Sequence, residues 1–260
     1  MRRTRHLLTV LLACACLPAS APASETVRLH ATLKPERLGH GTTLGFGFQI
    51  AAPGGQVPPA LTEFDLRYPG NLGIALSGIG LDTCSAAALE AFGPVGCPAD
   101  TNMGIGSGMA EVAFGPEIIR EAVELTVVRA ATQQGHIALL FHAQGVSPVY
   151  ADVVFGGLLL GAPAPFGGRV KISVPLVASL PGAPDVAVVK LSSTIGPEHL
   201  TYYERVHGRL VAYNPQGILL PNSCPRGGFP FAATLVFHDN SRASAYPTVP
   251  CPRSRPRRRL

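Results

Sequence analysis

The sequence predicts an all-β fold, a β-sandwich of immunoglobulin-like or jelly-roll-like type, built as one large or two small modules. Apolar and polar residues alternate in many short segments, which is the pattern of strands with one buried face. The chain also holds 29 Gly and 25 Pro among 260 residues. That content favours short strands joined by tight turns and disfavours long helices.

The expected strands follow one another at intervals of about ten residues, as in a sandwich or a related barrel. The first three span residues 26–33, 44–50 and 63–68, each with apolar side chains at every second position. A Gly-rich strand is expected over residues 104–114. Further strands are expected over residues 121–130, 136–143, 148–156, 169–176, 185–193, 208–213 and 231–239.

One short helix is expected inside a loop closed by a disulfide. The segment 85–93 is rich in Ala, follows the capping candidates Asp82 and Thr83, and ends at Gly93 before a proline. These are the start and stop signals of a helix.

Four cysteines follow the N-terminal segment, and an even number in an exported chain indicates disulfides. Four cysteines allow three pairings. Proximity in the sequence favours the pairing of Cys84 with Cys97 and of Cys224 with Cys251. Each closure is worth about 3–4 kcal/mol in the loop-entropy model.

Residues 1–23 have the three parts of a signal peptide: a basic start, an apolar run over residues 7–17, and small residues with prolines. Cleavage is expected after Ala23, so that an exported chain begins at Ser24. The alternative is a lipoprotein, because the segment LLAC resembles a lipobox and would make Cys14 the acylated N-terminus. The apolar run has 11 residues, whereas a membrane span needs about 20, so no transmembrane span is expected in the mature chain.

The mature chain divides into residues 24–133, a sandwich module with the first disulfide loop, and 134–252, a second β-rich module or the continuation of the same sandwich. Residues 253–260 are expected to form a disordered Arg-rich tail. Eight of the 21 basic residues lie in the signal and the tail, which leaves 13 against 16 acidic residues. Because the folded body carries no basic surplus, no specific nucleic-acid binding is expected.

The sequence contains no complete motif for binding a cofactor or a metal ion, or for a catalytic nucleophile. The glycines at 104, 106 and 108 lack the third glycine and the following helix of a dinucleotide loop, so they indicate bends or close backbone approach within a sheet. His136 and His142 lie about 20 Å apart on one strand, too far to share a metal ion, and each is expected at the surface or half-buried. No cofactor, metal ligand or catalytic residue is therefore assigned.

Two groups of polar residues are candidates for function. The densest acidic group could serve a glycosidase as a carboxylate pair, or it could be a solvated strand edge that discourages pairing; it consists of Glu111, Glu117, Glu121 and Glu124. A second group could form a binding patch for sugar rings or a partner, with core packing or a loop anchor as the alternative; it consists of Tyr202, Tyr203, His199 and His207.

The phrases GPVGCPADTNMGIGSGMAEV, LPNSCPRGGFPFAATLVFHDN and TVPCP resemble a group of uncharacterised exported proteins of high-GC actinobacteria. Those proteins share a Cys-Pro followed by a Gly-rich strand, and a late Cys-Pro-x-Gly-Gly-Phe before a terminal strand. The resemblance implies export and a cysteine framework. It implies no catalytic residue.

Three functional hypotheses follow. The leading one is a non-enzymatic secreted or envelope protein, a structural or interaction module whose partner is a cell-wall polymer or an envelope protein. The alternative is a secreted hydrolase acting on a polysaccharide or wall component. The third is a carrier of a small ligand or lipid, which requires an apolar cavity.

Overall fold

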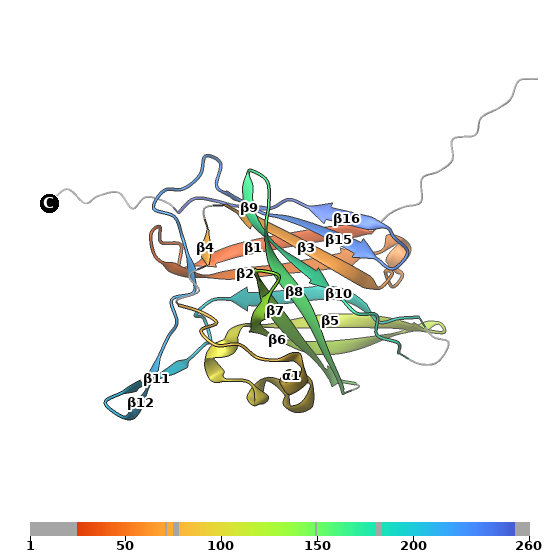
Figure 1. The fold of residues 1–260 in the computed structure, drawn as a ribbon. Helices are drawn as coiled ribbons and strands as arrows, with labels where there is room; N and C mark the ends of the chain where they lie inside the picture. The colour runs from red at the N-terminus through yellow and green to blue at the C-terminus, as the bar shows by residue number, and fades with distance from the viewer. Residues whose placement is uncertain (1–24, 71, 75–77, 149, 180–183, 253–260) are drawn as a thin grey trace, which may run out of the picture.

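The computed structural model describes residues 25–70, 72–74, 78–148, 150–179 and 184–252. The expected signal peptide, the alternative anchor Cys14 and the tail 253–260 lie outside these residues. The predicted all-β sandwich with one short helix inside a disulfide loop is confirmed. Both layers of the sandwich belong to one continuous sheet (Figure 1).

Thirteen strands form this sheet, and the paired neighbours on its main path run antiparallel. In spatial order the main path is β16 (Arg242–Ala245), β15 (Ala232–Phe237), β3 (Leu61–Pro69), β9 (Phe166–Ser173), β8 (Ala151–Gly161), β7 (His136–Ser147), β6 (Glu117–Gln133), β5 (Asn102–Phe114), β10 (Ala187–Ile195), β2 (Gly41–Ala51), β13 (Ile218–Leu219) and β4 (Gly73–Ile74). Off this path, β1 (Thr26–Lys34) pairs with β2 along its length.

The remaining elements are short. Two further pairs of strands are β11 (Tyr202–Val206) with β12 (Arg209–Tyr213), and β14 (Phe229–Pro230) with β17 (Thr248–Val249). The helices are α1 (Ala86–Phe92) and the 3-10 turns η1 (Pro53–Gly55), η2 (Gly93–Gly96) and η3 (Ala99–Thr101).

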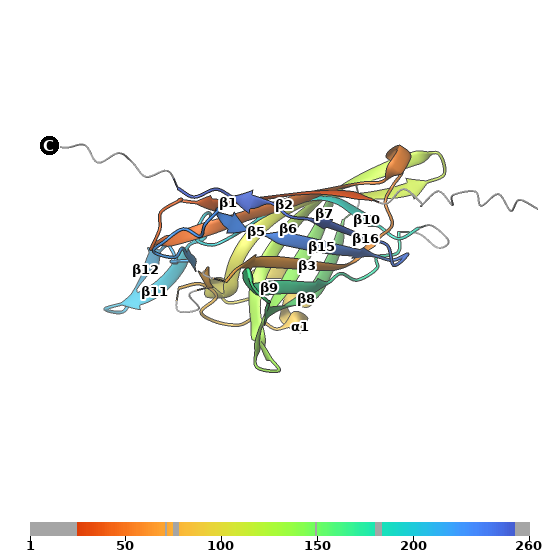
Figure 2. The same ribbon diagram turned by 90° about the horizontal axis from the view of Figure 1, so that it is seen from above.

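The sheet curls until its two edge strands meet, which makes a near-barrel. β1 and β16 lie against each other, and Ser241 Oγ donates a hydrogen bond of 3.0 Å to Glu25 Oε2 beside this seam. In Figure 1 the strands β1, β2, β3, β15 and β16 form the upper layer, and β5, β6, β7 and β8 the lower one. Seen from above in Figure 2, β15, β3, β9 and β8 follow one another around the side between the layers.

Segments 24–133 and 134–252 are interleaved in this sheet. Strand β9 pairs with β3, and β10 lies between β5 and β2. The residues 132–135, considered above as a module boundary, contain the turn between β6 and β7, where Gln133 pairs with His136.

Three glycines of β5 let the sheet turn from one layer to the other. Gly104 and Gly106 lie opposite the core residues Val127 and Leu125 of β6, and Gly108 lies opposite Val123, which lines the interior, so all three glycines face inward. A Cβ atom on Gly106 would lie 2.6 Å from the carbonyl oxygen of Ser192 on β10, and one on Gly108 would lie 2.9 Å from that of Lys190. Such close approach of backbones is open only to glycine, so these residues have the structural role that the sequence indicated.

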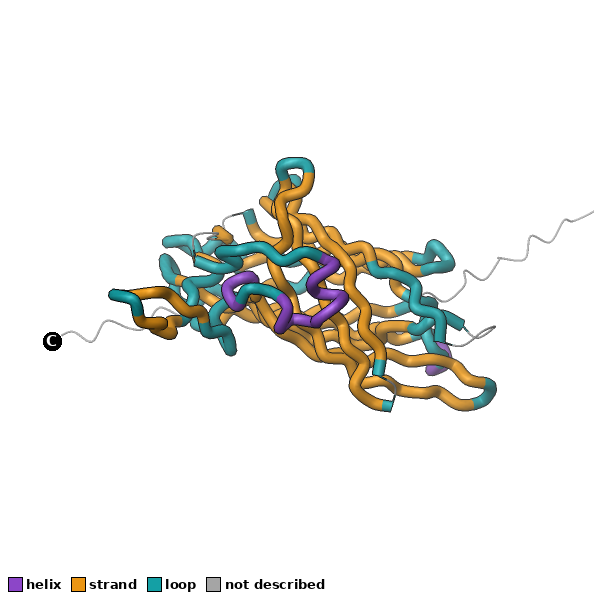
Figure 3. The backbone as a smooth tube through the Cα atoms, turned by 60° about the horizontal axis from the view of Figure 1, so that its bottom comes forward, coloured by secondary structure: helices purple, strands orange, loops and turns teal. Residues whose placement is uncertain are grey.

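Helix α1 covers the outer face of the lower layer (Figure 3). Its Leu89 is fully buried and packs with Val128, Ala130 and Leu140 of β6 and β7. The expected capping residues are wrong: Ser85, not Asp82 or Thr83, is the N-cap, and its hydroxyl accepts a hydrogen bond from the N–H of Ala88.

The end of the helix and both disulfides are as predicted. Gly93 ends α1 with a positive φ of 64°, a conformation that glycine adopts without strain. Cys84 is bonded to Cys97 and Cys224 to Cys251. The first bond ties the helical loop to the sheet, since the backbone N–H of Cys84 also donates to the carbonyl of Arg129 on β6.

We expect Gly106→Ala to destabilise the protein by about 1–3 kcal/mol, because the added methyl overlaps the carbonyl of Ser192 and must push two strands apart. Urea unfolding followed by circular dichroism measures the change. Gly161→Ala, at the end of β8, is the matched control because no atom lies within 4 Å of its added Cβ. Equal stability of the two variants would contradict the close packing of β5 on β10.

Candidate functional site

The antiparallel order gives the near-barrel two distinct ends. At one end, here called the open end, β3, β6, β8 and β10 begin and β2, β5, β7 and β9 finish. The opposite end is called the closed end. Side chains that point inward from these strands meet in the interior, and what fills each end decides whether the interior is accessible.

The closed end is filled by a second apolar cluster. It packs residues from β1, β2, the segment between β3 and β4, and the late part of the chain, namely Leu33, Leu44, Leu72, Ile218, Leu220, Phe229, Phe231 and Val249. Leu200, just before β11, and Tyr202, its first residue, are buried against the main core at this end. The disulfide Cys224–Cys251 lies beside the cluster, with Cys224 packed against it.

The interior toward the open end holds an apolar cavity of about 180 Å³, here called the outer chamber. Small residues on three strands of the lower layer, β5, β7 and β8, leave this space, because larger side chains would fill it; they are Gly108, Ala110, Ala143, Gly145 and Ala151. The remaining lining residues are Phe46, Phe48, Leu61, Phe64, Met109, Val123, Leu125, Phe141, Val153, Phe155, Ile172, Val174, Pro175, Val177, Val186, Val188 and Leu191.

The outer chamber is accessible from the open end. Along β7, Phe141 is buried whereas Ala143, nearer that end, is only half-buried. Along β9 and its continuation, Ile172 is buried and Val174 half-buried. Other lining residues at this end, namely Leu61, Ala110 and Gly145, are buried. Access to the outer chamber therefore lies beside Ala143 and Val174.

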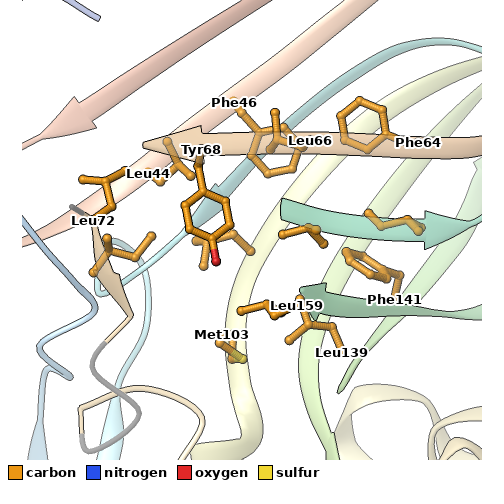
Figure 4. A pocket seen from close by; sticks show the side chains of 14 residues that line it. Leu44, Phe46, Phe64, Leu66, Tyr68, Leu72, Met103, Leu139, Phe141 and Leu159 are labelled. Carbon is orange, nitrogen blue, oxygen red and sulfur yellow. The ribbon is translucent and has the colours of Figure 1, made fainter. Parts of the chain in front are cut away.

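A smaller chamber of about 50 Å³ continues the interior toward the closed end (Figure 4). This inner chamber is lined by Leu44, Phe46, Phe64, Leu66, Tyr68, Leu72, Met103, Leu139, Phe141, Leu159, Val170, Ile172, Ile195 and Ile218. Four of them also line the outer chamber: Phe46, Phe64, Phe141 and Ile172. These four side chains, here called the partition, separate the two chambers.

Aromatic packing holds the walls in place. The rings of Phe46 and Phe64 stack with centroids 6.3 Å apart, and Phe48 contacts Phe64 at 5.2 Å. On the opposite layer, Phe141 and Phe155 stack at 5.3 Å. Such pairs add to the stability that burial alone gives, so the cavity is part of an ordered frame.

The chemistry of the two chambers is apolar. Tyr68 carries the one polar side-chain group among the lining residues, and burial raises the pKa of its hydroxyl. No lining residue carries a charge, and a charged or unpaired polar group placed there would lose its hydration without compensation. The arrangement can hold an apolar group and exclude water from it.

The four predicted patch residues are not gathered into one patch. His199 and Tyr202 line a separate surface pocket of about 270 Å³ together with Pro94 and Pro98. Tyr203 is 55% exposed on the β11–β12 hairpin, which projects from the closed end in Figure 1. His207 lies in the turn of that hairpin, with a φ of 48°.

Tyr202 is a buried anchor, the alternative that the sequence left open. Its hydroxyl accepts a hydrogen bond of 2.9 Å from the N–H of Gly80 and donates one to the carbonyl of Asn102. Its ring meets Tyr213 edge-on at 5.9 Å. Burial raises the pKa of Tyr202 to about 12. The residue therefore joins the hairpin, the loop before α1 and the start of β5.

The acidic group lies along the β5–β6 hairpin and lines neither chamber. Glu111 Oε1 accepts a hydrogen bond of 2.9 Å from Arg120 Nε, and Glu121 accepts one of 2.8 Å from the N–H of Ser147. Glu117 and Glu121 precede Ala122, where the pairing of β6 with β7 ends. This part of β6 is a strand edge, where charge discourages further pairing.

His142 is more buried than the sequence indicated. Only 4% of it is exposed, and its Nε2 lies 3.2 Å from Asp152 Oδ1 on β8. His136, six residues earlier, is exposed. Within the described ranges no group of three His, Cys, Asp or Glu is placed to hold a metal ion. Nor does this part of the chain contain a helix long and apolar enough to cross a membrane.

Comparison of the chain with protein-family models, with curated proteins and with solved structures finds no match. Function is therefore inferred from the cavity itself. Its lining residues were not predicted, because alternation marks a position as inward without telling whether a core or a cavity lies there. A signal was present: small residues recur at inward positions on strands β5, β7 and β8.

We expect Tyr202→Phe to lower the free energy of unfolding by about 1–2 kcal/mol, because the buried N–H of Gly80 loses its acceptor. Denaturant unfolding measures the loss. Tyr203→Phe is the matched control, since that ring is exposed and the change should stay within about 0.5 kcal/mol.

The pH dependence of the free energy of unfolding is a second test of Tyr202→Phe. The folded state keeps Tyr202 protonated up to about pH 12, whereas an unfolded tyrosine releases its proton near pH 10. The contribution to stability is therefore complete below about pH 10 and is lost as the pH rises toward 12. Tyr202→Phe should lose less stability than the parent over that interval; an identical loss would contradict the buried anchor.

Proposed function

We propose that the protein is an exported, non-enzymatic binding module that takes up a small apolar molecule in the outer chamber. This joins the leading hypothesis of an interaction module to the carrier hypothesis. The observation that carries it is the apolar cavity of about 180 Å³ inside an ordered near-barrel. An apolar cavity of about 150 Å³ is known to stay dry and to bind benzene.

Accessibility supports uptake from one side. The half-buried residues Ala143, Val174 and Val188 mark the open end, whereas the closed end is filled by the second apolar cluster. A ligand that enters at the open end replaces water on apolar surface, which is favourable in proportion to the area buried. Preformed walls lower the ordering cost of binding.

The hydrolase alternative receives less support from the cavity. A glycosidase needs two carboxyl groups about 5–9 Å apart across a cleft, and the lining residues of both chambers are apolar apart from the Tyr68 hydroxyl. A shallow groove of about 440 Å³ on the surface includes Glu111. That carboxylate is bonded to Arg120 and is the one acidic residue among the groove residues described.

Export belongs to the same proposal. Two disulfides are typical of proteins in oxidising compartments. The N-terminal segment has the composition of a signal peptide, and the resemblance to exported actinobacterial proteins is in keeping with it.

The N-terminus can be read by intact mass spectrometry of the protein from its native host. We expect a chain that begins at Ser24 and gains about 4 Da on reduction, because each of two disulfides takes up two hydrogens. A lipid-modified Cys14 would place the protein on a membrane surface instead. A full-length chain starting at Met1 would overturn export by this signal.

Ligand uptake can be measured by calorimetric titration with n-hexanol. We expect saturable binding with a negative heat-capacity change, the mark of apolar burial. Ala143→Leu should weaken binding at least about tenfold, because the larger side chain fills the outer chamber.

Ala212→Leu is the matched control. It adds the same atoms at an exposed position of β12, outside both chambers, and should leave the Kd unchanged. Absence of binding by the parent protein, or equal weakening by both substitutions, would overturn the proposed site.

A further inference from the structure

The two chambers lie in line along the interior. They share the partition residues, which come from β2, β3, β7 and β9. Beyond the partition, the inner chamber is bounded by residues near the closed end, among them Leu72, Met103 and Ile218. The inner chamber therefore lies between the partition and the closed end, against the same four side chains that bound the outer chamber.

The inner chamber is small as well as apolar. A water-sized group needs about 10–15 Å³ by this measure, so 50 Å³ has room for about three to five such groups. Figure 4 shows the lining side chains of β2, β3 and β7 converging on this space, with the ring of Tyr68 projecting into it from above. A few methylene groups in a row match this volume, whereas a ring with substituents does not.

The polar end of a ligand belongs at the open end. The lining offers a buried head group no charge and no hydrogen-bonding side chain other than Tyr68, and an unpaired buried polar group is costly. At the open end, Pro175 and Leu176 are exposed, so a head group placed beside them stays hydrated.

Resting on the proposed function, we infer that the ligand is an unbranched acyl or alkyl chain whose methyl end passes the partition into the inner chamber. The outer chamber holds the middle of the chain, and the head group stays in water. The partition then acts as a specificity filter: it admits a single extended chain and rejects branched or fused-ring ligands of equal size.

Chain length gives the test. Kd is measured calorimetrically for n-hexanol, n-octanol and n-decanol, and for 2-ethylhexanol as a branched isomer of n-octanol. We expect Kd to fall by up to about fifteenfold for each pair of methylenes while the chain end enters the protein. The branched isomer should bind at least about tenfold more weakly than n-octanol.

A pair of variants separates the chambers. Val170 lines the inner chamber alone and Val153 the outer chamber alone. Val170→Phe should abolish the advantage of n-decanol over n-hexanol and leave n-hexanol binding unchanged, whereas Val153→Phe should weaken all alcohols. If Val170→Phe does not fold, the smaller substitution Val170→Leu replaces it. This variant should also reduce the advantage of n-decanol over n-hexanol.

The possible outcomes test the chain-length inference separately from the proposed function. If no alcohol binds, the proposed function fails. If alcohols bind but affinity is independent of length, or if Val170→Leu leaves the preference for n-decanol intact, the chain-length inference fails while the outer chamber remains a binding site.

Discussion

The sheet can pass from one layer into the other because β5 and β10 approach more closely than side chains would permit. Gly104, Gly106 and Gly108 leave the inward side of β5 bare, and backbone carbonyls of β10 occupy the space where Cβ atoms would stand. This corner brings β10, and then β2 and β1, back over the lower layer. The seam between β1 and β16, the interior and both of its ends follow from that turn.

A sheet closed in this way must fill its interior, and here the filling is uneven. Phenylalanines from both layers form the partition and its supports, while alanines and glycines face the outer chamber. An unfilled inner chamber of about 50 Å³ costs on the order of 1 kcal/mol by the cavity scale. Retaining such a space is reasonable where a ligand supplies the missing contacts.

A buried tyrosine hydroxyl and a disulfide stabilise the closed end in addition to the hydrogen bonds between strands. Tyr202 links three segments through one hydroxyl, and the Cys224–Cys251 bond joins the chain before β14 to the chain after β17. These links act on parts of the chain with short strands, where backbone pairing is sparse. A firmly filled closed end leaves the open end as the route to the interior.

Alternation of apolar residues, four cysteines and a short Ala-rich run were enough to predict the longer strands, both disulfides and the helix, because each is a local or nearest-neighbour property. Short strands such as β4, β11 and β13 were not predicted. The N-cap was misassigned to Asp82 and Thr83, since neighbouring polar residues compete and only backbone geometry selects Ser85. The cavity lay beyond the sequence: Ala143 and Phe141 alternate as any inward pair does, and only strand order reveals that Ala143, Ala110 and Ala151 line one common space. Whether an inward position meets a neighbour or a void depends on residues far away in the chain, and the tertiary structure alone brings them together.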